Sequence, residues 1–203
     1  MANKKFAQLP ANMQEALATN AGIILSAFDP ANVGTAEEIR ANILYATTGG
    51  VSTTCVATYK DFGEDVDNCP KNTKELLQVD YWECKMSGTA LTVTGDNVTG
   101  LFGAADKGGS DVIEVTPRHN VKPEDFKTLW YVCPYGTQGG FVAVKLYNAL
   151  NTGGFSMQST DDGKGNFAFD YTGYTSIDNP HEVPFKFYLK ATDTSEVEET
   201  FAE

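Results

Sequence analysis

The sequence predicts a mainly β protein, an antiparallel β-sandwich or partial barrel with one flanking α-helix. Aromatic residues make up 11% of the chain, charged residues 21%, and 19 of its 203 residues are glycine, a composition rich in strand and turn formers. Four strand-like segments separated by glycine-bearing turns fill the last third, at 139–150, 154–160, 166–174 and 183–191. We expect a single domain, with an N-terminal arm (1–20), a β domain (21–191) and an acidic C-terminal tail (192–203).

The N-terminal part of the domain is expected to hold a strand at 22–28 and then the helix. Thr35 and Glu38 form a capping-box pair. We expect the helix that follows them to end at Gly49 and Gly50. The apolar face of this helix would consist of Ile39, Ile43 and Leu44.

The middle of the chain is expected to continue with strands and one further short helix. In order, we predict a strand at 51–62, a loop at 63–78, a strand at 81–91, a short helix at 96–106 and a strand at 111–117. A helix start is expected near Pro123, after which the chain becomes extended. Trp82, Cys84 and Met86 alternate with polar residues, which is typical of a half-buried strand.

The segment STDDGKGNFAFD at 159–170 combines carboxylates with glycines, as calcium loops and phosphate-binding loops do. Asp161 and Asp162 are adjacent, and Lys164 stands where a calcium loop needs a ligand. The glycines precede a strand, whereas those of a phosphate-binding loop open a helix. Apolar residues alternate on both sides, so the segment predicts the turn of a β-hairpin.

No catalytic constellation is recognisable in the sequence, so we expect no enzyme, cofactor or metal. His119 and His181 are the only histidines, and neither stands beside a serine or cysteine nucleophile. The paired carboxylates of 64–67 have no second acidic cluster with which to cleave a glycoside. The four cysteines form no C-x-x-C pair, and we expect them to be reduced, small buried hydrophobes: Cys55, Cys69, Cys84 and Cys133.

Charge and hydropathy limit the partners that the chain can have. The net charge is −12, much of it in the tail and in 61–67, which argues against a partner held by phosphate attraction. The longest apolar run near the N-terminus, 21–28, is too short to cross a bilayer. No signal-peptide core precedes it, so we expect synthesis in the cytoplasm.

The order of several segments resembles the major tail protein family of long-tailed bacteriophages, whose members are tail tube subunits. The resemblance covers about 21–191 and rests on ATTGGV (46–51), DFGEDVDNCPKNTKEL (61–76), WECKMSGTAL (82–91), LFGAAD (101–106), TPR (116–118), DFKTLWYV (125–132), NALNTGGF (148–155), GKGNFAFDYTGY (163–174) and VPFKFYLKA (183–191).

The resemblance implies the tail-tube fold and a structural role in the virion tail. Family members form hexameric rings that stack into a tube, and DNA passes through its lumen without specific binding. The implied partners are other copies of the chain and the tape-measure, tail-tip and tail-terminator proteins, with no membrane. Tube subunits of contractile tails and of phage-like secretion systems share this architecture and remain alternatives, as do a non-catalytic sandwich that binds carbohydrate or acts as an adhesin, and a glycan hydrolase.

The segment 61–76 is the predicted contact between adjacent rings, because it is too long for a tight turn and carries charges of both signs. Its candidate contact residues are Asp61, Glu64, Asp65, Asp67, Lys71 and Lys74. The alternative is a surface loop folded back on its own domain. Because six acidic copies repel one another at low salt, we also expect the free subunit to stay monomeric until a tail tip or a tape-measure protein nucleates assembly.

Overall fold

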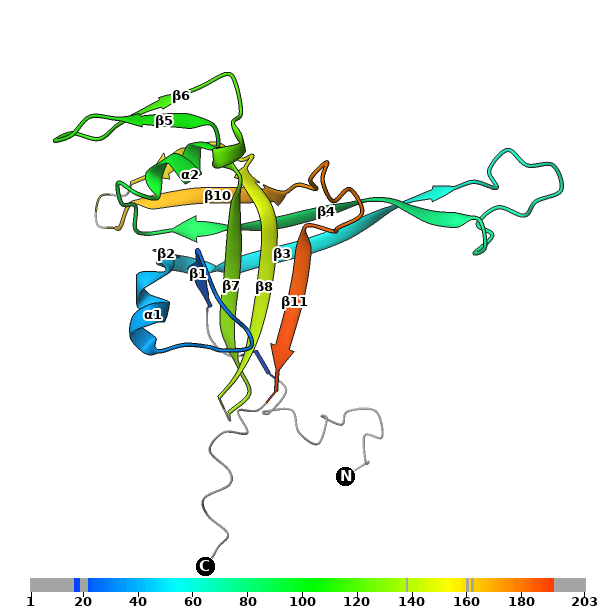
Figure 1. The fold of residues 1–203 in the computed structure, drawn as a ribbon, viewed down its shortest axis with the longest axis horizontal. Helices are drawn as coiled ribbons and strands as arrows, with labels where there is room; N and C mark the ends of the chain where they lie inside the picture. Colours follow the sequence, from blue (N-terminus) through cyan, green and yellow to red (C-terminus); the bar gives the residue numbers. More distant parts are fainter. Residues whose placement is uncertain (1–16, 19–21, 138, 160, 162, 192–203) are drawn as a thin grey trace, which may run out of the picture.

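The computed structural model describes residues 17–18, 22–137, 139–159, 161 and 163–191, which form a mainly β fold (Figure 1). The strands are β1 (Ile23–Leu25), β2 (Ile43–Tyr45), β3 (Thr47–Asp61), β4 (Leu77–Ala90), β5 (Ala105–Gly108), β6 (Glu114–Pro117), β7 (Lys127–Tyr135), β8 (Gly140–Asn151), β9 (Ser156–Gln158), β10 (Asn166–Gly173) and β11 (Phe185–Lys190). The helices are α1 (Ala36–Ala41), α2 (Val98–Phe102) and a 3-10 turn at Pro123–Asp125.

Nine of these strands form one antiparallel sheet. Seven follow the order β2-β1-β7-β8-β10-β4-β3, with β11 added to β8 and β9 added to β10. The outermost strands β2 and β3 do not pair with each other in the described part of the chain, so the sheet is open and not a closed barrel. The mainly β, antiparallel, sandwich-like architecture predicted from the sequence is therefore confirmed at this level.

The direction of the sheet changes at strand β8, because one edge of this strand pairs with two different strands in turn. Its first part pairs with β11 over 141–146, whereas its end pairs with β10 over 149–151. Between the two partners the pairing with β7 shifts register, and Asn148 has a φ of 45°. Asparagine tolerates this left-handed conformation better than most residues, and a bulge bends the strand that carries it. Figure 1 shows β7, β8 and β11 running across the direction of β3, β4 and β10.

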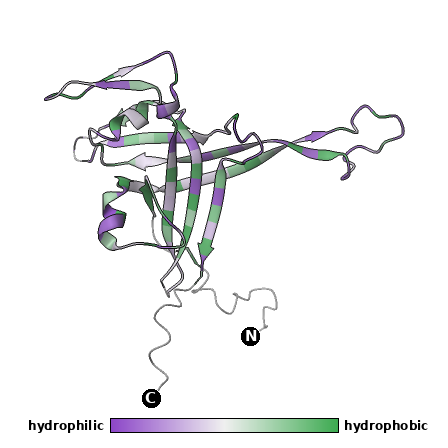
Figure 2. Ribbon diagram, in the orientation of Figure 1, coloured by the Kyte–Doolittle hydropathy of each residue, from purple (hydrophilic) through white to green (hydrophobic). Residues whose placement is uncertain are grey.

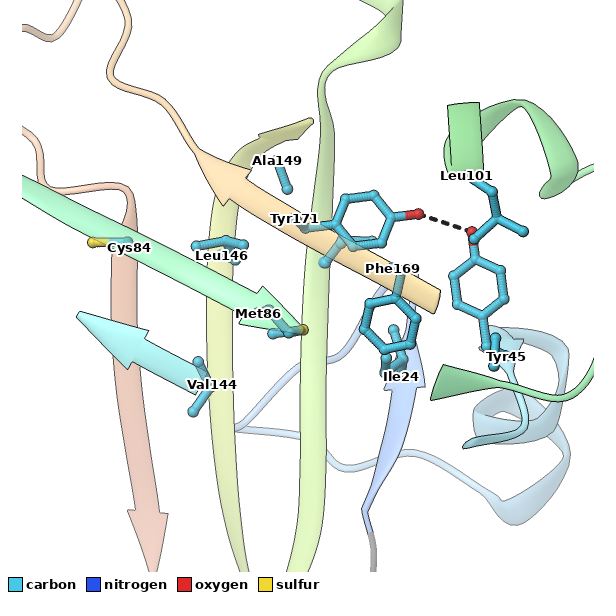
Figure 3. Close-up of a cluster of buried hydrophobic side chains, with 12 residues drawn as sticks. Ile24, Tyr45, Cys84, Met86, Leu101, Val144, Leu146, Ala149, Phe169 and Tyr171 are labelled. Atoms are coloured by element: carbon cyan, nitrogen blue, oxygen red, sulfur yellow. Dashed lines mark hydrogen bonds between the residues drawn. The ribbon is translucent and has the colours of Figure 1, made fainter. Parts of the chain in front are cut away.

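The main core lies between these two parts of the sheet (Figure 3). Met86 and Phe169 come from one part, and Val144, Leu146 and Ile24 come from the other. All five are 3% exposed or less, as expected for strands whose apolar face meets a second layer. The hydroxyls of Tyr45 and Tyr171 lie 2.9 Å apart inside this core and satisfy each other's need for a hydrogen bond.

The other face of β1, β7 and β8 is covered by the segment that contains α1. Phe28, Val33 and Ile39 pack there against a smaller cluster that includes Trp130 and Phe141. The exposed surface of α1 is mostly hydrophilic (Figure 2). The flanking helix thus uses its few apolar residues to seal one side of the sheet.

Helix α1 starts as predicted and ends earlier than predicted. The capping box of Thr35 and Glu38 is present. The helix stops at Ala41, however, and Ile43–Tyr45 is strand β2, so the expectation of a helix reaching the glycines was wrong. The reason is tertiary: the β-branched Ile43 and its neighbours pair with β1. The two glycines lie instead within β3, where both have positive φ at a register shift.

A second α-helix and a separate hairpin lie above the sheet (Figure 1). The helix, α2, falls within the short helix predicted at 96–106, although the last residues of that range belong to β5. The β5–β6 hairpin pairs only with itself in the described residues, and its first strand was not predicted. Arg118 ties it to the 3-10 turn through ion pairs with Asp106 and Asp125. Helix α2 is joined to the sheet by the Asn151 amide, which donates to the Leu101 carbonyl at 2.6 Å.

The C-terminal third agrees with the prediction. All four expected strands are present as β8 to β11. Strand β9 pairs with β10 through Gln158 and Asn166, so 159–165 is the turn of a hairpin as predicted, although residues 160 and 162 lie outside the described part. The expected acidic tail also lies outside it. Of the expected N-terminal arm only Leu17 and Ala18 are described, and Ala18 pairs with Tyr135.

Candidate functional site

The β3–β4 hairpin extends beyond the body of the protein, and its outer part is the candidate site. Strand β10 pairs with β4 only as far as Cys84, opposite Gly173. From there outward β3 and β4 have only each other as partners among the described residues. Figure 1 shows this part projecting away from the rest of the molecule. We call residues 56–83 the arm, which is distinct from the expected N-terminal arm at 1–20, and the loop 62–76 lies at its tip.

One face of the arm carries an exposed apolar stripe, which we call the arm stripe. Its members are Tyr59 (59% exposed), Leu77 (42%), Val79 (43%) and Trp82 (39%). Trp82 shares its face with the buried Cys84, because strand residues two apart point the same way. The arm stripe therefore continues the core-facing side of β4 past the point where the core ends.

A β-bulge keeps this stripe on one face. On β4, Trp82 and Cys84 are even-numbered, whereas Val79 and Leu77 are odd-numbered, so a regular strand would place the two pairs on opposite faces. The pairing shifts register after Thr58, which pairs with Tyr81 while Tyr59 pairs with Val79, leaving Asp80 as the extra residue. This extra residue returns the apolar side chains to the core-facing side.

The opposite face of the arm is mixed. Val56 and Tyr81 are exposed there, at 57% and 56%. Their neighbours on the same face are polar or charged, including Glu83, Lys60 and Gln78. The arm therefore has one predominantly apolar face and one amphiphilic face. A monomer gains nothing from a bare apolar stripe, and such patches in folded proteins mark contact surfaces.

A groove of about 540 Å³ runs along the base of the arm. It lies between the outer part of β4 and the segment 172–184. Aromatic and ionisable side chains line it, among them Tyr81, Trp82, Tyr174, His181 and Glu182. The edge of β4 that faces this groove lacks a strand partner in the described residues, so its backbone groups are available to pair with an added strand.

The loop at the arm tip contains the predicted contact residues and has its own internal structure. The Asp61 carboxylate accepts hydrogen bonds from the backbone N–H of Gly63 at 2.8 Å and of Asn72 at 3.1 Å, so Asp61 shapes the loop. Lys74 forms an exposed ion pair with Glu75 at 3.4 Å. The remaining candidates are exposed on the loop, namely Glu64, Asp65, Asp67 and Lys71. Figure 1 shows the loop away from the body and not folded back on it.

The two histidines lie in different parts of the fold. His181 lines the groove, whereas His119 follows the β5–β6 hairpin. The described residues contain no group of three or more histidine, cysteine or acidic side chains that is close enough to hold a metal ion. Cys84 and Cys133 are buried as predicted, and Cys55 and Cys69 are half-buried. Within the described ranges no helix has the length and hydropathy to span a bilayer.

Comparison with known proteins adds no relative. Neither the protein-family models nor the curated proteins that were searched gave a match to this chain. The site therefore has to be interpreted from its own geometry. The sequence analysis proposed the charged tip loop as a contact surface and missed the arm stripe. The lengths of the predicted strands 51–62 and 81–91 were a signal, because strands are usually five or six residues long.

Proposed function

We propose that the chain is a structural virion protein, the tail tube subunit of a long-tailed bacteriophage, which assembles into stacked hexameric rings. The observation that carries this proposal is the arm stripe, an apolar face on a projecting hairpin. A second copy of the chain is its occupant, because a closed ring of identical subunits gives every arm the same partner surface. The proposal includes the tail-tube form of the β-sandwich, with the channel lined by strands of all six subunits.

Open sheet edges support self-assembly. Strands β2, β3 and β11 each have one strand partner among the described residues. Strand β11 also exposes Phe187 (58%) and Leu189 (52%). Unpaired edges with exposed apolar residues are a liability in a monomer, and lateral pairing in a ring removes it.

The charge of the chain fits a tube that conducts DNA. A net charge of −12 per subunit gives the wall no general attraction for phosphate, so a duplex slides through without being held. The same charge opposes ring formation at low salt. The proposed partners are a tail-tip protein that starts such a tube, a tape-measure protein that sets its length and a tail-terminator protein that ends it.

Assembly of the purified protein tests the proposal. We expect a monomer in dilute low-salt buffer, and rings or tubes at high protein concentration in about 1 M salt, where the Debye length falls to about 3 Å. Sedimentation velocity and negative-stain microscopy report both states. Long tubes in dilute low-salt buffer would contradict the charge argument. A monomer at every salt and protein concentration, even after a tail-tip or tape-measure protein is added to nucleate assembly, would contradict the proposal itself.

Two matched variants locate the contact. Val79 and Gln78 are adjacent, exposed and on opposite faces of the arm. Val79→Asp places a charge in the arm stripe and should abolish assembly. Gln78→Asp adds the same charge to the opposite face, and its assembly should be closer to that of the wild type than the assembly of Val79→Asp is. Equal behaviour of the two variants would remove the arm stripe from the interface.

A non-catalytic binding module is the second candidate, and the groove at the base of the arm is the observation that favours it. Among the side chains that line the groove, Trp82 and Tyr174 are exposed and offer aromatic surface to a sugar ring. A titration of Trp82 fluorescence with soluble glycans separates the two proposals. Saturable quenching by a glycan in a protein that never assembles would favour the binding module.

A further inference from the structure

Cys55 and Cys84 face each other across the β3–β4 pair at the base of the arm. They are direct partners in the strand register, and their sulfur atoms lie 3.0 Å apart. Directly opposite residues of antiparallel strands have Cα atoms about 4.5 to 5.5 Å apart, a separation that a disulfide accepts. A disulfide bond would shorten the separation of these two sulfurs to about 2.05 Å.

The position of the pair in the fold is also distinctive. Cys84 is the last residue of β4 that pairs with β10, so the hairpin changes here from a three-stranded to a two-stranded ladder. An isolated two-stranded hairpin is at best marginally stable in water. A covalent bond at this point would hold the two strands together where the body stops supporting them.

We infer that Cys55 and Cys84 form an intramolecular disulfide when the protein meets a disulfide oxidant such as oxidised glutathione, and that this bond clasps the base of the arm. The inference stands on the cysteine geometry alone and does not depend on the proposed function.

The two cysteines have different roles in this reaction. Cys84 is fully buried, and burial raises the pKa of its thiol well above the usual value, so it is neither reached nor ionised first. Cys55 is half-buried and is the entry point. Its thiolate attacks oxidised glutathione, forms a mixed disulfide and releases one reduced glutathione.

The sulfur of Cys84 then displaces the second glutathione and closes the bond. The two protein thiols lose two electrons in all and the oxidant gains them, and their two protons end on the two glutathione thiols. The product closes a loop from residue 55 to residue 84 that includes the whole arm. Cys69 at the arm tip and Cys133 on β7 remain as thiols.

Thiol counting and peptide mapping test the inference. The native protein is incubated with oxidised glutathione, denatured, alkylated with iodoacetamide and weighed by mass spectrometry. We expect two alkylated cysteines where the reduced protein has four, no glutathione adduct, and a Cys55–Cys84 peptide on mapping. Four alkylated cysteines, a stable glutathione adduct, or a link that uses Cys69 or a second chain would overturn the inference.

Two variants and a thermal measurement complete the test. Cys69→Ser should still lose two thiols to the bond, whereas Cys55→Ser should form none. Because the closed loop restricts the unfolded chain, oxidation should raise the melting temperature of the wild type by about 5 °C or more, and that of Cys55→Ser not at all. An equal shift in both proteins would show that the stabilisation has another source.

Discussion

The inner and outer parts of the β3–β4 hairpin share one continuous strand pairing and differ in what covers them. In the inner part Cys84 and Met86 are fully buried against β7, β8 and β10. In the outer part Val79 and Tyr59 continue the same apolar face with 43% and 59% of their surface exposed. The alternation of a strand thus defines which face is apolar, while the rest of the molecule decides how much of that face is covered.

The largest expected effect comes from the same substitution made in both regions. Leu146 is fully buried in the main core, whereas Leu77 is 42% exposed on the arm. Leu146→Ala should lower the free energy of unfolding by about 2 to 5 kcal/mol because it leaves a cavity. Leu77→Ala should lower it by less than about 1 kcal/mol. Urea denaturation of the monomer measures both, and equal losses would show that the arm is part of the folded core.

The next effect concerns a buried polar residue that holds α2 to the sheet. The Asn151 amide donates to the Leu101 carbonyl and accepts from the N–H groups of Gly153 and Asp170. Asn151→Ala should cost about 1 to 3 kcal/mol of unfolding free energy, since it leaves buried backbone groups without partners. The control Asn32→Ala, in an exposed loop, should change little. Chemical denaturation decides, and a cost below that of the control would contradict this role.

An alkaline pH dependence is expected from the core tyrosines. Burial raises the pKa of both Tyr45 and Tyr171 above the ordinary 10.0. The unfolded chain therefore loses these protons first, and the same holds for the buried Cys84 thiol, whose pKa burial also raises. Stability should fall above about pH 9 as the thiol contributes, and more steeply above about pH 10, by up to about 1.4 kcal/mol per pH unit for each tyrosine.

Urea midpoints measured from pH 8 to 11 test this dependence. Tyr171→Phe removes one of the two ionisable tyrosines and should give a shallower decline. An unchanged slope in this variant would place the alkaline sensitivity elsewhere in the molecule.

The smallest effect on global stability is expected at the arm tip. Asp61→Ala removes the acceptor of two backbone N–H groups in the loop 62–76. The free energy of unfolding should change by less than about 0.5 kcal/mol, because the body does not depend on the loop. Limited proteolysis should nevertheless cleave the loop several times faster than in Asp65→Ala, a control in the same loop. Equal cleavage rates would mean that Asp61 does not order the tip.

Much of the fold follows from local pattern. Double glycines and alternating apolar residues located the four C-terminal strands, and the capping box of Thr35 located the start of α1. The end of α1 could not be found in this way, because pairing of Ile43 with β1 overrides a helical periodicity that the sequence also supports. Tertiary contact decides between two patterns that are both locally acceptable.

The candidate site was predictable only in its charges. The exposed acids and lysines of 61–76 are visible in the sequence, and whether they contact another ring stays a prediction. The arm stripe depends on the bulge at Asp80, which changes the parity of the apolar positions on β4 and has no sequence signature of its own. The opposition of Cys55 and Cys84 likewise depends on the strand register, which spacing along the chain does not specify.

Hydrogen–deuterium exchange of the outer part of β4 tests the central claim most directly. The amides of 77–83 are compared between the dilute low-salt monomer and the concentrated high-salt protein, with the core strand β8 as internal reference. We predict rapid exchange of 77–83 in the monomer and strong protection in the assembled protein, while β8 is protected in both. Unchanged exchange of 77–83 in an assembled sample would show that the arm is not the surface that joins the subunits.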